Sequence, residues 1–382
     1  MSVAIHLRRA LGALVILAAA ALPASAAPSI ETIAREAVLI DATTGTVLFE
    51  KNANARMPTS SMSKVMTMYM VFDRLKAGRL SLDDKLPVSE NAWKMQGSKT
   101  WVELGNTVRV EDLIRGVIIQ SGNDASIVLA EGLAGTEQAF AAAMTKRAHE
   151  MGMKDSNFMN STGWPDENHY STAHDLAILA QALIKEFPEY YHYYSETEFT
   201  YHGIKQGNRN PLLYRNMGVD GLKTGHTEIA GYGLIASGQR NGRRLILVVN
   251  GLPNMQARAD ESARLLEWGF REFDTYAFFK SGDTVDSFPV WLGEQEQVPL
   301  VAEGDIKLTL TREQRRNIQV AVVGEAPVPA PIAKGTKLAT LRVTGPDIKT
   351  VEIPLVAGAD VAQLGFGGRI AAAARHFISG TP

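Results

Sequence analysis

The chain has 382 residues, of which 45% are hydrophobic and 21% charged, and its formal net charge at pH 7 is -2. This balance is that of an ordinary globular protein, long enough for a large domain and a smaller one. It gives no electrostatic reason to expect nucleic acid as a partner. The sequence contains no cysteine, which excludes disulfides, thiolate chemistry and most zinc sites.

Residues 1–26 have the pattern of a secretory signal peptide. Arg8-Arg9 precedes an apolar run over residues 10–22, and the small residues that a signal peptidase needs follow at Ala24-Ser25-Ala26. The apolar run is shorter than the roughly 20 residues that a membrane span requires. We therefore expect an exported protein whose mature chain begins at Ala27.

A hairpin and a buried helix are expected next. Residues 36–52, EAVLIDATTGTVLFEKN, place two apolar runs around a turn at Thr44-Gly45. Residues 58–75, PTSSMSKVMTMYMVFDRL, leave almost no polar face, which predicts one long helix buried on nearly all sides. Lys64 lies one turn into that helix. A buried ammonium must be paired or lose its proton, so this lysine needs a chemical explanation.

Further helices and then strands are expected along the chain. Helical periodicity covers residues 110–150, with a break at Ser121-Gly122-Asn123, and returns over residues 171–187. The extended segment GVDGLKTGHT, residues 218–227, predicts an edge strand. The apolar runs on both sides of Asn241-Gly242 predict a hairpin.

The sequence changes character from about Gly282. Short alternating runs separated by turns predict an all-β domain. The final segment from residue 366, FGGRIAAAARHFISGTP, predicts a short helix with apolar residues on one face and two basic residues that can meet anionic headgroups. These residues are Phe366, Ile370 and Phe377, with Arg369 and Arg375.

Ser61 and Lys64 are three residues apart, so in a helix they share one face. A serine hydroxyl is a weak nucleophile until a base takes its proton, and an adjacent lysine can do so if burial or a nearby positive charge keeps it neutral. Backbone N–H groups at the helix amino terminus favour negative charge on a substrate oxygen beside Ser61. The alternative is a snorkelling surface lysine, because S-x-x-K alone is common.

Two more motifs bear on this choice. Ser121-Gly122-Asn123 interrupts two helices, and its hydroxyl and amide can relay a proton and hold a substrate amide; the alternative is an ordinary break between helices. Lys223-Thr224-Gly225 lies on the predicted edge strand, where Gly225 allows an extended ligand to approach and the side chains before it offer a cation and a hydroxyl.

In the order S-x-x-K, S-x-N, K-T-G, these motifs resemble the serine acyl-transferase set of penicillin-binding proteins and serine β-lactamases. The wider context resembles the D-alanyl-D-alanine carboxypeptidases, low-molecular-mass penicillin-binding proteins of family S11. The segments that carry this resemblance are PTSSMSKVMT, IIQSGNDASIVLAEGLAG, HYSTAHDLAILAQALI and VDGLKTGHTEIAGYGLIASGQRNGRRLILVV. The resemblance covers about residues 36–275. The β domain and the terminal helix resemble those of the membrane-associated members of the family more loosely.

The resemblance implies an α+β fold, in which a β-lactamase/transpeptidase-like catalytic domain combines an antiparallel sheet with a helical cluster and precedes a small C-terminal all-β domain. The expected divisions are a signal peptide at 1–26, the penicillin-binding domain at 27–276, the β-rich domain at 277–364 and an amphipathic membrane-anchor helix at 365–382.

The resemblance also implies catalytic roles. Ser61 would be the acylated nucleophile and Lys64 its base. Ser121 and Asn123 would shuttle a proton and position the peptide. No metal and no other cofactor is implied.

The implied substrate-binding residues lie on the edge strand. Lys223 and Thr224 would bind the terminal carboxylate beside Gly225, and the backbone N–H groups of Ser61 and His226 would form the oxyanion hole. Lys223 would also supply a positive charge that helps keep Lys64 neutral.

The implied reaction removes the terminal D-alanine from peptidoglycan stem peptides ending in D-Ala-D-Ala, and β-lactam antibiotics would acylate the same serine. The implied place is the periplasm, with peripheral contact to the inner membrane. A serine β-lactamase is an alternative that the extra β domain and S-G-N in place of S-D-N disfavour, although Asp166 and Glu167 lie where a deacylating acid would be sought. A non-catalytic peptidoglycan-binding envelope protein is a second alternative, but it has no need of Lys64 beside Ser61.

Other constellations fail. No G-x-S-x-G elbow is present, GSKT at 97–100 lacks the glycine spacing of a phosphate loop, and His149-Glu150 lacks the second histidine of a zincin. His169 and His174 are interpreted as polar residues of a loop and a helix start.

Overall fold

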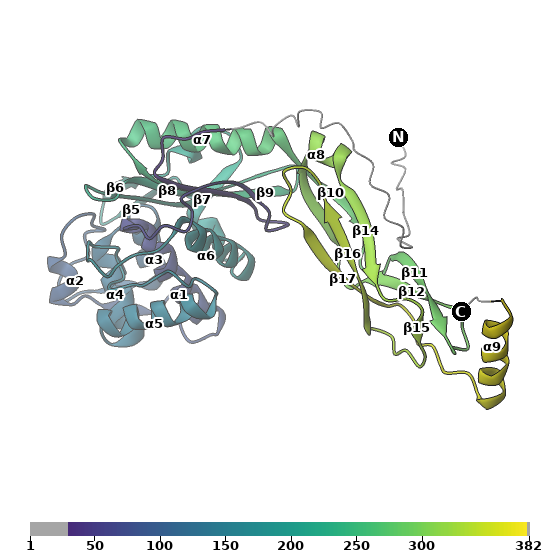
Figure 1. Ribbon diagram of the computed structural model, residues 1–382. Helices are drawn as coiled ribbons and strands as arrows, with labels where there is room; N and C mark the ends of the chain where they lie inside the picture. The colour runs from purple at the N-terminus through teal and green to yellow at the C-terminus, as the bar shows by residue number, and fades with distance from the viewer. Residues whose placement is uncertain (1–29, 380–382) are drawn as a thin grey trace. The chain divides into compact units, whose positions relative to one another are not determined.

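The computed structural model describes residues 30–379, with side-chain surroundings up to residue 372. The described chain forms two compact units, one from Ile30 to Arg271 and one from Glu272 onward. Figure 1 shows the elements of both units. The first unit combines an antiparallel sheet with a cluster of helices and the second is rich in β-strands, which agrees with the α+β fold that the sequence predicted.

The first unit is built on a five-stranded sheet of order β2-β1-β9-β8-β7, in which all neighbours are antiparallel. Both predicted hairpins are confirmed, and Asn241 and Gly242 have the positive φ angles, 50° and 78°, that a two-residue turn of this hand requires. Strand β7 lies at the edge. The strands are β1 (Glu36–Asp41), β2 (Val47–Lys51), β7 (Val219–Thr227), β8 (Gly231–Arg240) and β9 (Arg243–Leu252).

Helices cover both faces of this sheet (Figure 1). Helix α7 (Met255–Glu272) packs on one face, where Gly269 approaches Leu39 and Leu245 closely. The helical cluster lies on the other face, with α6 against β9. Its elements are η1 (Ser60–Ser63), α1 (Lys64–Lys76), α2 (Glu90–Lys94), α3 (Val110–Ile118), α4 (Asn123–Ala134), α5 (Glu137–Glu150), α6 (Ala173–Glu186), η2 (Tyr191–Ser195) and η3 (Pro211–Tyr214), with the short strand pairs β3 (Lys85–Pro87) and β4 (Thr107–Arg109), β5 (Glu198–Tyr201) and β6 (Ile204–Gly207).

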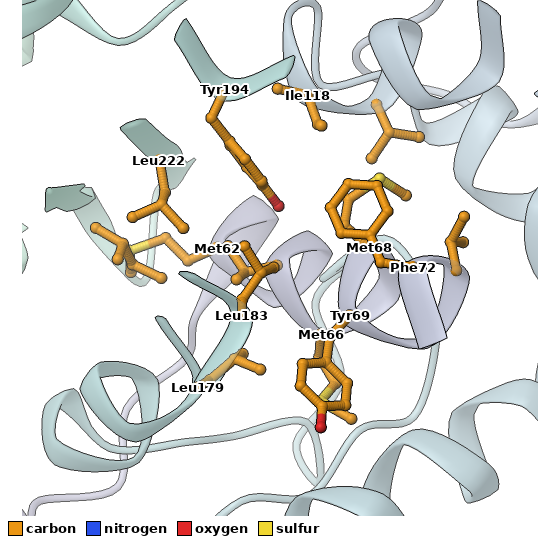
Figure 2. Close-up of a cluster of buried hydrophobic side chains, with 14 of the residues drawn as sticks. Met62, Met66, Met68, Tyr69, Phe72, Ile118, Leu179, Leu183, Tyr194 and Leu222 are labelled. Carbon is orange, nitrogen blue, oxygen red and sulfur yellow. The ribbon is translucent and has the colours of Figure 1, made fainter. Parts of the chain in front are cut away.

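The predicted buried helix at 58–75 begins later than expected. Residues 60–63 form the 3₁₀ turn η1, and the α-helix starts at Lys64. The prediction of one continuous helix was wrong because Ser60 has a φ of 50°, outside the right-handed helical region. The expected burial is confirmed: Figure 2 shows η1 and α1 side chains meeting residues from α3, α6, η2 and β7 in one core.

In the residues that the structure describes, the second unit consists of β-strands and two helices. Its main sheet has the order β14-β16-β17-β12-β11-β15, and β10 pairs with β13. The short helix α8 was not predicted, although its capping box, Thr311 with Gln314, is visible in the sequence as T-R-E-Q. The elements are β10 (Phe273–Phe279), β11 (Thr284–Trp291), β12 (Gln297–Ala302), β13 (Ile306–Thr311), α8 (Arg312–Asn317), β14 (Gln319–Gly324), β15 (Val328–Pro329), β16 (Lys337–Thr344), β17 (Val351–Ala357) and α9 (Phe366–Ser379).

Both expected targeting segments lie at the chain ends. The signal peptide predicted at 1–26 falls outside the described residues. In helix α9, Phe366 and Ile370 are exposed, whereas Arg375 and Phe377 lie beyond the described side chains. Among the described helices, none has the length and apolar character needed to span a bilayer.

Candidate active site

Lys64 is fully buried at the start of α1, and its ammonium nitrogen faces three oxygen atoms. Nζ lies 3.0 Å from Ser61 Oγ, 2.7 Å from Asn123 Oδ1 and 2.7 Å from the carbonyl oxygen of Thr162. The amide and carbonyl oxygens can only accept hydrogen bonds, whereas the serine hydroxyl can also donate. A neutral Lys64 amine therefore keeps N–H bonds to Asn123 and Thr162 and turns its lone pair toward the Ser61 hydroxyl.

The environment of Lys64 favours this neutral form. Burial lowers the pKa of Lys64 from 10.5 to about 7, and the positive charge of Arg209 adds to the effect, while Asp124 and Glu137 oppose it. Within the described part of the chain, no carboxylate oxygen lies within salt-bridge distance of Nζ. The helping charge was expected from Lys223. The cation that lowers the pKa of Lys64 is Arg209, and the repulsion between Lys64 and Lys223 is expressed in the lowered pKa of Lys223.

The motif Ser121-Gly122-Asn123 lies between α3 and α4. Its last residue, Asn123, is the first residue of α4 and contacts Lys64. Asn123 Nδ2 donates to the carbonyl of Gln96 at 2.7 Å, which fixes the amide so that Oδ1 faces Lys64. A Cβ on Gly122 would lie 2.0 Å from Thr100 Oγ1, so only glycine fits there. The break between the helices is thus held by the loop that precedes α3.

Ser121 is buried and has a φ of 66°, a conformation that costs free energy in a non-glycine residue. Its Oγ has no hydrogen-bond partner among the described residues. A buried hydroxyl without a partner is uncommon. This arrangement leaves the hydroxyl available to a bound substrate, and it makes no hydrogen bond to Lys64 among the described residues.

Asp124, which the sequence analysis missed, holds the neighbouring loop. Its carboxylate accepts backbone N–H bonds from Thr100 and Trp101, each at 2.8 Å, and from Val102 at 3.2 Å. An acid in the first turn of a buried helix is the signal that could have identified it. The loop it fixes carries Gln96, and through Gln96 the carboxylate helps position Asn123.

Strand β7 places the K-T-G motif beside η1. Lys223 and Thr224 are buried, and Lys223 Nζ donates to the carbonyl of Thr224 at 3.1 Å. Burial, together with the charges of Lys64, Arg209 and Arg258, holds the pKa of Lys223 well below its usual value. His226 is exposed and stacks on Tyr232 with ring centroids 3.9 Å apart.

The structure gives a packing reason for the glycine at position 225. A Cβ at this position would lie 2.8 Å from the carbonyl oxygen of Thr59 and 3.2 Å from Ser60 Cβ. The space on the Cβ side of the glycine is thus filled by the segment that carries Ser61. Gly225 allows β7 to pack directly on η1, which brings the predicted oxyanion-hole residues into neighbouring positions.

His169 forms a hydrogen bond with Ser63, the last residue of η1. Its Nδ1 accepts the backbone N–H of Met159 at 3.2 Å, so Nε2 carries the proton of the neutral ring and donates to Ser63 Oγ at 2.7 Å. Burial lowers the pKa of His169 to about 4. The histidine is therefore a neutral anchor for the turn that carries Ser61, in the loop where the sequence analysis placed it.

Comparison with known proteins identifies the family of the chain. Residues 22–254 match the family model of D-alanyl-D-alanine carboxypeptidase, peptidase family S11, and residues 273–363 match that of the C-terminal domain of penicillin-binding protein 5. The D-alanyl-D-alanine carboxypeptidase DacA of Escherichia coli K12 is 37% identical over 342 residues, covering 87% of this chain and 85% of DacA. The chain belongs to the D-alanyl-D-alanine carboxypeptidase family.

Solved structures agree with this membership. Penicillin-binding protein 5 from Haemophilus influenzae aligns with a TM-score of 0.81 and 36% identity, covering 88% of this chain and 99% of that one. Penicillin-binding protein D2 from Listeria monocytogenes in its ampicillin-bound form aligns with a TM-score of 0.59 and 31% identity, covering 64% and 100%. The chain is a serine-type D-Ala-D-Ala carboxypeptidase, as its motifs predicted.

Two arginines at the carboxypeptidase site were missed by the sequence analysis. Arg209 lies between β6 and η3 and donates to Ser98 Oγ at 2.6 Å. Arg258 is buried in α7 over the ring of Tyr232, and burial lowers its pKa to about 10. Neither residue belongs to a recognisable motif. Both act on the pKa of Lys223, so the site is electropositive beyond what the lysines alone provide.

Proposed function

We propose that Ser61 is the nucleophile that attacks the carbonyl carbon between the two terminal D-alanines of a peptidoglycan stem peptide. Neutral Lys64 takes the hydroxyl proton as the Oγ–C bond forms. The proton then passes to the leaving amine as the C–N bond breaks, with the Ser121 hydroxyl as the relay. Water releases the acyl group from Ser61 in the second step. The contact between Lys64 Nζ and Ser61 Oγ carries this proposal.

The oxyanion of each tetrahedral intermediate would be bound by the backbone N–H groups of Ser61 and His226. The close packing of Gly225 against Thr59 and Ser60 supports this assignment, because it brings the two chain segments together. Each such donor is worth on the order of 10²–10³ in rate.

The terminal carboxylate of the substrate would be bound by Lys223 and Thr224, with Arg209 as a further cation. Among the described residues, Lys223 Nζ donates one hydrogen bond, to the carbonyl oxygen of Thr224. A substrate carboxylate would supply the missing counter-charge and raise the pKa of Lys223 on binding.

β-Lactams would acylate the same serine, a proposal that the likeness to the ampicillin-bound Listeria protein supports. Labelled penicillin tests it with a matched pair of variants. Ser61→Ala should abolish covalent labelling, whereas Ser60→Ala should retain it, because Ser60 Oγ faces Thr227 and not Lys64. Equal labelling of wild type and Ser61→Ala would reject Ser61 as the nucleophile.

We further propose that residues 1–26 direct the chain to the periplasm and that residues 365–382 hold it at the inner membrane. The penicillin-binding domain would span 27–276 and the β-rich domain 277–364. The exposed Phe366 and Ile370 at the start of α9 support the membrane contact. Truncation after Leu364 should release the mature protein from anionic vesicles at low salt without changing cleavage of a soluble peptide. Identical co-sedimentation of both proteins would leave α9 without a membrane role.

A further inference from the structure

The loop at residues 160–164 carries a carbonyl oxygen that accepts a hydrogen bond from the base. This oxygen belongs to Thr162, and Lys64 Nζ donates to it at 2.7 Å. A neutral amine has two N–H bonds and one lone pair, so the positions of its two acceptors decide where the lone pair points. The other acceptor, Asn123 Oδ1, is held in place by the carbonyl of Gln96. The mechanism therefore also requires a fixed carbonyl at Thr162.

Ser161, the residue before Thr162, connects this loop to helix α5. Its backbone N–H and its hydroxyl both donate to Glu137 Oε1, at 3.0 Å and 2.7 Å. Ser161 is fully buried, and a buried N–H that loses its acceptor costs free energy. Hydrogen bonds to an ionised acceptor are also stronger than those to a neutral one. The carboxylate therefore ties the loop to the first turn of α5.

Helix α1 holds the other side of Ser161. The hydroxyl of Thr67 donates to the carbonyl oxygen of Ser161 at 2.6 Å. Within the loop, Asn160 Oδ1 accepts the backbone N–H of Thr162 at 3.2 Å. Because Asn160 is itself part of the loop, it shapes the turn but does not place the turn relative to α1. That placement comes from Thr67 on one side and Glu137 on the other.

Glu137 also acts on Lys64 through its charge. In the described part of the chain, its carboxylate has no cationic partner. Burial dominates the pKa of Lys64, Arg209 lowers it further, and the acids raise it. The charged and titratable groups that interact with Lys64 are Glu137 of α5, Asp124 of α4, Lys223 of β7, Arg209 and His169. The contacts of Glu137 and its charge therefore have separate effects on the base.

We propose that Glu137 is a positioning residue for the base. Through Ser161 it fixes the carbonyl of Thr162, and this carbonyl orients the Lys64 amine so that its lone pair faces Ser61. Among the described residues, Glu137 makes no hydrogen bond to Lys64 or Ser61, so its contacts act on the reaction through the loop. The inference rests on the function proposed above, because that function makes Lys64 the base.

The test measures the acylation rate constant with labelled penicillin as a function of pH, in the mature protein and in two variants. Glu137→Asp keeps the charge but is one methylene shorter, so it draws away from Ser161. Its limiting rate constant at high pH should fall roughly tenfold, as expected for a slightly misplaced group. Glu137→Gln keeps the length and an acceptor oxygen but loses the charge. Its limiting rate constant should stay close to that of wild type, while the acidic limb should move to lower pH by about 0.5 unit, less than a charge in direct contact would cause.

A merely structural role would reverse this order. An acid in the first turn stabilises a helix through its dipole, and Asp keeps that effect whereas Gln loses it. Glu150→Gln, at the far end of α5 beside Arg147, is the matched control and should change neither the limiting rate constant nor the limb. A limiting rate constant in Glu137→Asp equal to that of wild type would overturn the proposal, as would an equal loss in Glu137→Gln. Failure of the wild type to form a covalent penicillin adduct would instead contradict the proposed function.

Discussion

Strand β7 contacts a partly buried arginine near its start and carries a buried lysine further on, and the fold treats the two in opposite ways. Near its start, Asp220 receives both arms of the Arg244 guanidinium, with each N–O distance at 2.7 Å. Burial lowers the pKa of Arg244, but the hydrogen bond and charge of Asp220 outweigh it, and the net pKa is raised. This cation is matched by a carboxylate and by the Ser237 hydroxyl.

Three residues further on, Lys223 and its neighbour Lys64 have no such match. Their nitrogen atoms face carbonyl, amide and hydroxyl oxygens, and the pKa of each lysine is lowered, chiefly by burial. An unpaired buried charge costs free energy. The arginine that is paired with a carboxylate therefore stabilises the fold, whereas neutral Lys64 can accept a proton and Lys223 can bind a substrate carboxylate.

Replacing the unmatched lysine gives the largest expected effect. Lys64→Met keeps the length of the side chain and removes the base, so acylation by penicillin should fall on the order of 10²–10⁴-fold. The melting temperature should not decrease, because the variant no longer buries an amine. A large loss of melting temperature would show that Lys64 serves the fold and would break the comparison.

Removing the matched carboxylate should do the opposite. Asp220→Asn leaves the Arg244 guanidinium partly buried without its counter-charge, and the free energy of unfolding in urea should decrease by about 1–3 kcal/mol. The acylation rate constant should stay within about twofold of wild type. Asp260→Asn, which breaks the exposed pair with Arg215, is the control and should change stability little. If both variants lowered the free energy of unfolding equally, the Asp220–Arg244 pair would matter no more to stability than the exposed Asp260–Arg215 pair.

A smaller effect is expected on the pH dependence. Since the neutral form of Lys64 is the base and its pKa is about 7, the acylation rate should rise as the pH increases through about 7. Arg209→Gln removes a nearby positive charge, which favours the protonated form of Lys64 and raises its pKa. The acidic limb of the pH profile of the acylation rate should therefore move to higher pH. A limb that stays in place would show that Arg209 does not act on the base.

Features that depend on residues close together in the sequence could be predicted. Ser61 and Lys64 are three residues apart, and that spacing alone brings Oγ and Nζ to 3.0 Å even though the turn is 3₁₀ and not α-helical. The turn at Asn241-Gly242 was predictable because its backbone conformation is one that these residue types adopt. Such features depend on neighbours in the chain.

The remaining features depend on contacts between distant segments. Arg209 acts on Lys64 from a loop more than a hundred residues away, and no local pattern indicates that encounter. Gly225 was predicted to allow ligand access, and its small size has a further reason in its packing against Thr59 and Ser60, which lie far from it in the sequence. These atoms come together only in the folded chain. The sequence therefore predicted the motifs but not the contacts that explain some of their residues.

The central claim is that Lys64 is held neutral beside Ser61, and the pKa of Lys64 tests it most directly. The side-chain signal of Lys64 in protein labelled with ¹³C- and ¹⁵N-lysine can be followed by NMR and assigned by its loss in Lys64→Met. The account predicts a midpoint near pH 7, at the value of about 7 that burial and Arg209 impose. A midpoint near the ordinary lysine value of about 10.4 would contradict it, because the amine would then be charged whenever the enzyme acts.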